Sequence, residues 1–150
     1  GWTVLAKMLN AGRTGSAAEM VGVGTGAMDL TFDYLKQRKQ FGRVIGEFQA
    51  LQHRAAHLYG EMEMARSAVL KAQNLLDEDD PRAELYASVA KAKAGLACCL
   101  SVREGVQMHG GIGMTDEYDI GLYMKRDRAL AEFMGDIYFH ADRVAKLNGY

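Results

Sequence analysis

The chain has 150 residues, 49% of them hydrophobic, and its 18 basic and 19 acidic side chains give a formal net charge of -1. A chain of this length forms one domain with a hydrophobic core, and its well-mixed charges exclude the basic stripe that a nucleic-acid-binding surface needs. Uninterrupted apolar runs, such as residues 95–100, are far too short to cross a bilayer, so we expect no membrane-spanning segment.

The first predicted helix covers roughly residues 2–37 and carries one apolar face at helical spacing. It also contains several glycines, each of which costs about 1 kcal/mol of helix stability against alanine. Such glycines are tolerated where another backbone or a ligand comes close. The face comprises Met20, Val23, Ala27, Leu30 and Tyr34, and the glycines are Gly12, Gly15, Gly22, Gly24 and Gly26. No initiator methionine precedes this helix, which predicts that the chain is a fragment of a longer protein.

The strongest helical pattern lies in residues 48–76, where apolar or small residues recur at alternating steps of three and four. The acidic run 77–80 ends that helix. Asp80 is predicted to cap a third helix, with Pro81 at its first position. The third helix ends at the glycines after His109. Its predicted buried face comprises Leu85, Val89, Ala92, Leu96, Cys99 and Val106.

The last third of the chain predicts two shorter helices. Thr115 or Asp116 can cap a fourth helix that runs to about Met134, and Asp136 can start a fifth that runs to Leu147. No segment alternates polar and β-branched residues for long, so we predict no strands. Long helices with short connections predict an all-α fold, an up-and-down four-helix bundle with a short extra C-terminal helix.

The first of two glycine-bearing junctions, residues 38–49, reads RKQFGRVIGEFQ. It places Arg38, Gln40, Phe41 and Gln49 between the first two helices. Arginine pairs well with phosphate oxygens, and a phenylalanine can cover a flat ring system. A purely structural role explains the same residues equally well. The cations would then stabilise the dipole at the end of the first helix, and the glycine would form a turn after it.

The second junction, residues 107–113, reads QMHGGIG. Its glycines allow a sharp turn and a close approach to a ligand, and Gln107 offers a donor and an acceptor. Met108, Gly110 and Gly111 lie in the same run. A glycine-rich helix end is the alternative, because a lone glycine cluster is a weak signal.

Together the two junctions resemble the acyl-CoA dehydrogenase family, through R-K-x-F-G-x-x-I-G-x-F-Q followed some sixty residues later by Q-x-x-G-G-x-G-x-x-x-E-Y. The resemblance implies that residues 1–150 are that family's C-terminal helical domain, which packs in tetramers and holds part of FAD across a subunit boundary. It implies FAD contacts from Arg38, Gln40, Phe41, Gln49, Gln107, Met108, Gly110 and Gly111. Arg13 matches an arginine near the acyl-CoA thioester, and Asn10 replaces the acidic residue usual three positions earlier.

The family removes an α-proton with a carboxylate and transfers a β-hydride to the flavin. The base is usually the glutamate of a Y-E-G-T run, which falls on residues 133–136, where Met134 replaces it. A thioether cannot accept the proton. Some members place the base on the first helix, where this chain has Gly12. The catalytic residue is therefore left unassigned, with Glu19, Glu132 and Asp136 as the nearby substitutes.

Three functions fit these observations. The first is an acyl-CoA dehydrogenase with a relocated base, or its incomplete subunit in a homo- or hetero-oligomer, working with an electron acceptor flavoprotein. The second is a flavin-dependent monooxygenase of the same fold, and the third is a non-enzymatic helical assembly module. We expect the isolated domain to bind FAD poorly and to be inactive.

Two further groups of residues have simpler explanations. The adjacent Cys98 and Cys99 predict buried thiols in a reducing cytoplasm. His53, His57 and Glu61 follow at steps of four on one helix face, but a solvent-facing polar stripe explains them better than a metal site. No Glu-x-x-His motif occurs, so no metal is predicted. His140 has no triad partners in the sequence and reads as a surface or interface residue.

Overall fold

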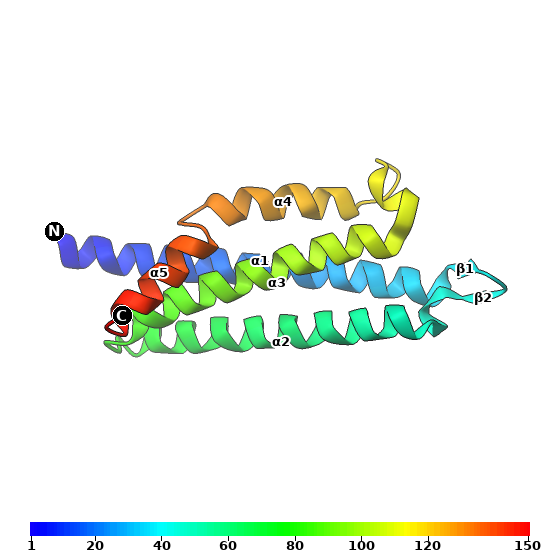
Figure 1. The fold of residues 1–150 in the computed structure, drawn as a ribbon. Helices are drawn as coiled ribbons and strands as arrows, with labels where there is room; N and C mark the ends of the chain where they lie inside the picture. Colours follow the sequence, from blue (N-terminus) through cyan, green and yellow to red (C-terminus); the bar gives the residue numbers. More distant parts are fainter.

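The computed structural model describes residues 1–150 and contains five helices. They are α1 (Trp2–Gln37), α2 (Gln49–Asp77), α3 (Ala83–His109), α4 (Ile120–Glu132) and α5 (Ile137–Leu147). The first four alternate in direction along one long bundle, and α5 lies against α3 near the N-terminal end of α1 (Figure 1). The predicted all-α, up-and-down four-helix bundle with an extra C-terminal helix is confirmed.

The bounds of α1 agree with the predicted ones, and α5 begins as predicted. Asp136 caps α5, because its carboxylate accepts the backbone N–H of Phe139 at 2.7 Å. A side-chain acceptor at this position satisfies one of the free N–H groups of the first helical turn. The predicted cap is therefore confirmed in detail.

Two predicted helix starts are wrong. The N-cap of α3 is Arg82 and not Asp80, whose carboxylate accepts hydrogen bonds from the backbone N–H of Arg82 at 2.8 Å and from the Arg82 guanidinium. These bonds hold residues 80–82 in a turn, and α3 begins only at Ala83. The start of α4 is also later than predicted, at Ile120. The chain first makes a short 3-10 helix, η2 (Gly110–Met114), which the glycines after His109 allow.

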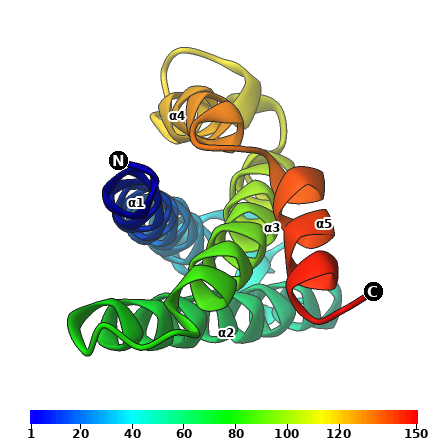
Figure 2. The same cartoon turned by 90° about the vertical axis from the view of Figure 1, so that its left-hand side faces the viewer.

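Helix α3 is the centre of the bundle, surrounded by α1, α2, α4 and α5 (Figure 2). It buries a face of small residues, which include Ala87, Ser88, Ala90, Ala94, Ala97 and Ser101. The predicted bulky face of α3 is therefore wrong, and Leu96 is 53% exposed. A helix with neighbours on several sides needs small side chains so that their backbones can approach.

The contact between α1 and α3 shows how close this approach is. A side chain at Gly24 would bring its Cβ within 3.2 Å of the Cys98 Cα. The Ser101 hydroxyl donates a hydrogen bond to the Gly24 carbonyl at 2.6 Å. Gly24 therefore serves a backbone contact, as the glycine content of the first helix predicts.

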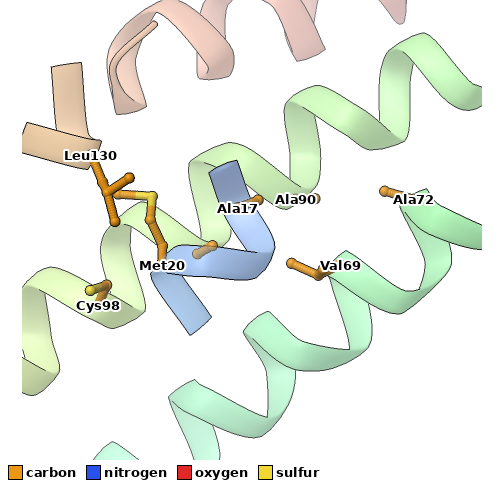
Figure 3. Packing of buried hydrophobic residues seen from close by; sticks show 8 residues of the cluster. Ala17, Met20, Val69, Ala72, Ala90, Cys98 and Leu130 are labelled. Carbon is orange, nitrogen blue, oxygen red and sulfur yellow. The ribbon is translucent and has the colours of Figure 1, made fainter. Parts of the chain in front are cut away.

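The larger apolar side chains of the core come from the flanking helices. Met20, Val69 and Leu130 converge from α1, α2 and α4 onto the alanines of α3 (Figure 3). A second cluster nearer the other end joins Leu58, Met62 and Met108 with further residues. The predicted apolar face of α2 is largely confirmed, with Leu58, Met62, Ala65, Val69 and Ala72 buried, although Leu75 is buried in place of the predicted Leu76.

The helical stretch Ala83–Met114 is long and apolar enough, by length and composition alone, to cross a membrane. The prediction from uninterrupted runs missed it because isolated polar residues interrupt those runs. Within the bundle, 56% of its apolar window is buried. A core helix that is packed among four other helices has the same length and composition.

Candidate functional site

A small hairpin connects α1 to α2, which corrects the prediction that the chain has no strands. Its strands β1 (Lys39–Gln40) and β2 (Arg43–Val44) pair antiparallel, with Gln40 opposite Arg43. Phe41 and Gly42 form the two-residue loop with φ angles of 55° and 79°. Two successive positive φ angles define the turn that suits a tight hairpin. Strands of two residues are too short to show an alternating pattern in the sequence.

The hairpin and the glycine run after α3 meet in one groove of about 370 Å³. Seven of the eight residues predicted to contact a cofactor line it, although they come from two junctions far apart in the chain. They are Arg38, Gln40, Phe41, Gln107, Met108, Gly110 and Gly111. The eighth, Gln49, is an exposed residue at the start of α2 and does not line the groove.

The groove offers an unpaired cation and an exposed aromatic ring. No carboxylate binds the guanidinium of Arg38, whereas the neighbouring Arg54 binds Glu104 at 2.5 and 3.0 Å. Phe41 is 90% exposed at the hairpin tip, with only the edge of Phe48 beside it at 6.1 Å between ring centroids. An anionic ligand with a flat ring would satisfy both Arg38 and Phe41.

Two glycines of the groove, Gly110 and Gly111, present only backbone to it. Gly110 has a φ of 66°, and no atom lies within 4 Å of the position a Cβ would take at Gly110 or Gly111. The side chain of Met108, in contrast, is buried in the core. This arrangement therefore disfavours a direct contact between the Met108 side chain and a cofactor.

An aromatic cluster missed by the sequence supports the groove. The His109 ring lies 4.4 Å from that of Tyr34 and 4.7 Å from that of Tyr118, between centroids. Its Nδ1 donates to the Gly105 carbonyl at 2.7 Å, and burial lowers the pKa of His109. The ring is therefore a neutral wall component. Only the folded chain brings these three residues together, so no local signal predicts the cluster.

A second group of predicted residues lies at the other end of α1. Arg13 is only 8% exposed, and its guanidinium donates to the Asn10 side-chain oxygen at 3.2 Å. Burial and the cation of Arg143 lower the pKa of Arg13. Its Nε atom has no partner. Arg13 is thus a buried cation whose one hydrogen-bond acceptor is neutral.

The two positions that lack the expected carboxylate lie against each other. The Cε of Met134 is 2.8 Å, and its Sδ 3.5 Å, from the position a Cβ would take at Gly12. Met134 sits in the turn between α4 and α5 with a φ of 63°. The space that a side chain at position 12 would need is therefore filled by the thioether of Met134.

The three substitute carboxylates each already bind a group of this chain. Glu19 forms an ion pair with Arg126 on α4. Glu132 lies 3.6 Å from Arg128 within α4. Asp136 caps α5, as described above.

The structure also places the remaining candidates. Cys98 is buried and Cys99 half-buried, and both are free thiols. His53 and His57 are exposed, and Glu61 binds Lys93 at 2.6 Å. The three side chains do not form a group that could hold a metal ion. His140 is fully buried, which corrects its interpretation as a surface residue.

The two groups of candidate residues lie far apart. Both Arg13 and the end of α1 before Arg38 belong to one continuous helix, which runs the length of the bundle (Figure 1). At about 1.5 Å per residue, roughly 37 Å of helix separate Arg13 from Arg38.

Several known proteins are similar to this chain in sequence and in fold. Residues 1–147 match the family model described as acyl-CoA dehydrogenase, C-terminal domain. The short/branched chain specific acyl-CoA dehydrogenase of Bos taurus, a mitochondrial protein, is 36% identical over 138 residues, 92% of this chain and 32% of that protein. The subunit CarC of the caffeyl-CoA reductase-Etf complex of Acetobacterium woodii is 38% identical over 120 residues, 80% of this chain and 31% of that protein.

Among solved structures, butyryl-CoA dehydrogenase from Megasphaera elsdenii superposes with a TM-score of 0.91 at 29% identity. The match covers 95% of this chain and 37% of that one. The chain thus spans about a third of the length of these relatives.

Proposed function

The chain belongs to the acyl-CoA dehydrogenase family as a C-terminal helical domain, and on that premise we propose that it is the FAD-holding, base-deficient part of such an enzyme. Its full-length protein takes part in the α,β-dehydrogenation of an acyl-CoA thioester. The absence of a free carboxylate at Gly12, at Met134 or beside them carries this proposal. The base then comes from another subunit of a mixed assembly.

The groove fits FAD by the chemistry of its residues. Arg38 is positioned to pair with the pyrophosphate, Phe41 to cover a ring, and the backbone at Gly110 and Gly111 to approach the cofactor closely. When bound, FAD supplies the oxidant of the reaction. Gln40 and Gln107 add amide donors and acceptors to the groove, and Gln49 lies outside it.

The length of α1 supports a cofactor shared between subunits. Arg13 would meet the acyl-CoA at one end of the helix, and Arg38 would meet FAD at the other. We propose that the groove of one subunit holds the FAD of a neighbour, in a mixed assembly built through these helical domains.

We propose three further features of the working protein. Acyl-CoA is the substrate of the full-length protein. An electron acceptor flavoprotein reoxidises the reduced FAD. The name of the CarC relative, which places that protein in a complex with Etf, supports such a partner. The free thiols Cys98 and Cys99 are compatible with the cytoplasm as its location.

The proposal is tested on the full-length protein together with any chain that co-purifies with it. We expect a yellow protein whose flavin is reduced by an acyl-CoA without oxygen. The amide variants Glu19→Gln, Glu132→Gln and Asp136→Asn should all keep that reduction. Loss of reduction in one variant that still holds FAD would place the base in this chain, and a colourless assembly that takes up no FAD would exclude the proposal altogether.

The groove is tested with a matched pair of cations. Arg38→Ala should weaken FAD binding roughly tenfold or more, the usual loss for a charge-assisted hydrogen bond. Lys36→Ala is the control, because Lys36 lies at the same helix end but pairs with Asp33 at 3.4 Å outside the groove. Equal FAD content in the two variants, measured by flavin absorbance per protein, would remove Arg38 from the site.

A further inference from the structure

The turn between α4 and α5 has a backbone that requires external support. Helix α4 ends at Glu132, after which Met134 and Gly135 both have positive φ angles, 63° and 103°. A non-glycine residue in this region costs about 1 to 3 kcal/mol and persists only where its surroundings hold it. The turn's own bond is long, with the Gly135 N–H 3.4 Å (N to O) from the Glu132 carbonyl.

Two buried side chains bind the carbonyl groups of this turn. The Lys91 Nζ, from the central helix α3, donates to the carbonyls of Leu130 at 2.9 Å and Gly135 at 3.1 Å. The His140 Nε2, from α5, lies 3.0 Å from the Met134 carbonyl. A carbonyl oxygen only accepts, so the imidazole proton is on Nε2. Lys91 is 2% exposed and His140 is fully buried.

The hydrogen bonds that both side chains form with this turn go to backbone carbonyls. Their contacts therefore fix where position 134 points without depending on which side chain stands there. That direction is towards α1, where the Met134 methyl fills the space over Gly12, the residue before Arg13. Gly135 packs against Phe139 and His140. A Cβ at position 135 would lie 2.5 Å from the Phe139 ring and 3.0 Å from the His140 Nε2.

We propose that Lys91 and His140 are positioning residues that direct whichever side chain stands at position 134 onto Gly12. The role of that direction at the acyl-CoA end rests on the proposed function, but the direction itself does not. A carboxylate introduced by Met134→Glu would be carried to the same place, over Gly12.

The direction of position 134 can be measured by NMR on protein whose methionine methyl groups carry ¹³C. The chain has nine methionines, and Met134→Leu identifies the signal to follow by its loss. We expect a nuclear Overhauser effect between the Met134 methyl and the α-protons of Gly12. In Lys91→Met and His140→Leu this effect should fall severalfold, while the signals of the core residues Met20 and Met62 stay in place.

Two variants separate positioning from ordinary core packing. Lys93→Met is the matched control, since Lys93 lies two residues further along α3 and binds Glu61 at 2.6 Å, away from the turn. It should leave the Met134 signal unchanged. His140→Gln keeps an amide donor and should restore the contact that His140→Leu loses, which also decides the question if Lys91→Met does not fold.

A contact of full strength in both Lys91→Met and His140→Leu would overturn the proposal, and so would an equal loss in Lys93→Met. Flavin reduction by acyl-CoA in the assembled Met134→Glu protein is a separate experiment, which tests the proposed function and not the positioning role. If the Met134–Gly12 contact behaves as expected but no variant of the assembled protein responds to acyl-CoA, the proposed function fails and the positioning role stands.

Discussion

Buried ionisable side chains gather at the end of the bundle where α1 meets the α4–α5 turn. Arg13, Lys91, Asp127 and His140 are each less than a tenth exposed. Burial raises the pKa of Asp127 and lowers the pKa of Lys91, and in each case the other's charge opposes the shift. Such groups cost stability unless they are paired, so they are expected where a site needs them.

His140 should make the stability of the protein depend on pH. Burial lowers its pKa to about 4, and the cations of Arg13, Lys91 and Arg143 act in the same direction. An unfolded histidine titrates near 6.5, so between about pH 6.5 and 4 the unfolded chain binds a proton that the folded chain does not. The free energy of unfolding should therefore fall by on the order of 3 kcal/mol as the pH drops through that window.

Urea denaturation at pH 7 and pH 4.5 measures this effect, with His140→Gln as the control. The variant cannot take up the proton, so its free energy of unfolding should change less over the same window. His109, whose pKa burial also lowers, titrates in both proteins and cancels from the difference. Identical pH dependence in the two proteins would refute the role of His140.

At the residue scale, the sequence predicted the groove better than the opposite end. The residues predicted to contact a cofactor lie in two short motifs, and seven of the eight line one groove. Lys91 and His140 could not be found that way, since each binds backbone groups that no side-chain motif records. Their signal exists only in the folded chain.

At the scale of single elements, α3 packs through its small residues. Ala94 is fully buried at the centre of the bundle, whereas Leu96 is 53% exposed. Ala94→Leu should lower the free energy of unfolding by about 1 to 3 kcal/mol, because a tightly packed core does not accept extra methylene groups. Leu96→Ala should change it by less than about 1 kcal/mol.

Urea denaturation of the two α3 variants decides between the observed face and the one predicted from the sequence. A larger loss in Leu96→Ala than in Ala94→Leu would favour the predicted bulky face.

The caps of α4 and α5 form a natural comparison. Asp136 accepts the Phe139 N–H, whereas Asp119 caps α4 without a side-chain hydrogen bond. Asp136→Ala should therefore cost about 1 kcal/mol of stability, and Asp119→Ala much less. Thermal unfolding of both variants measures this, and equal shifts would mean that the Asp136 hydrogen bond contributes nothing.

Elements followed from local sequence where their signals were local. The 3.6-residue periodicity predicted α1 and α2, and a capping residue predicted the start of α5. The buried face of α3 could not be predicted, because alanine and serine carry no strong preference and only the number of neighbouring helices decides which side is buried. The start of α3 was predicted too early because residues 80–82 form a turn before the helix begins at Ala83.

At the scale of the whole molecule, large apolar side chains remain uncovered near the start of α1. Trp2, Val4 and Met8 are 75%, 64% and 65% exposed. Contiguous exposed apolar surface favours association. We expect these 150 residues on their own to self-associate, as sedimentation velocity would show through a concentration-dependent mass.

The same 150 residues should hold FAD poorly, because the groove is open on one side and has no second domain to close it. Gel filtration after incubation with FAD should return a colourless protein with no acyl-CoA turnover. Stoichiometric FAD on the isolated chain, or any turnover by it, would contradict this expectation.

The span of α1 also has a genetic consequence. Where the groove of one chain serves the cofactor of its neighbour, an allele altered at Arg38 damages the neighbour's site, and an allele altered at Arg13 damages its own. An oligomer that mixes these two chains then contains one site with both defects and one with neither. Two recessive alleles at opposite ends of a single helix would complement each other in a heterozygote, whereas two alleles at the same end would not.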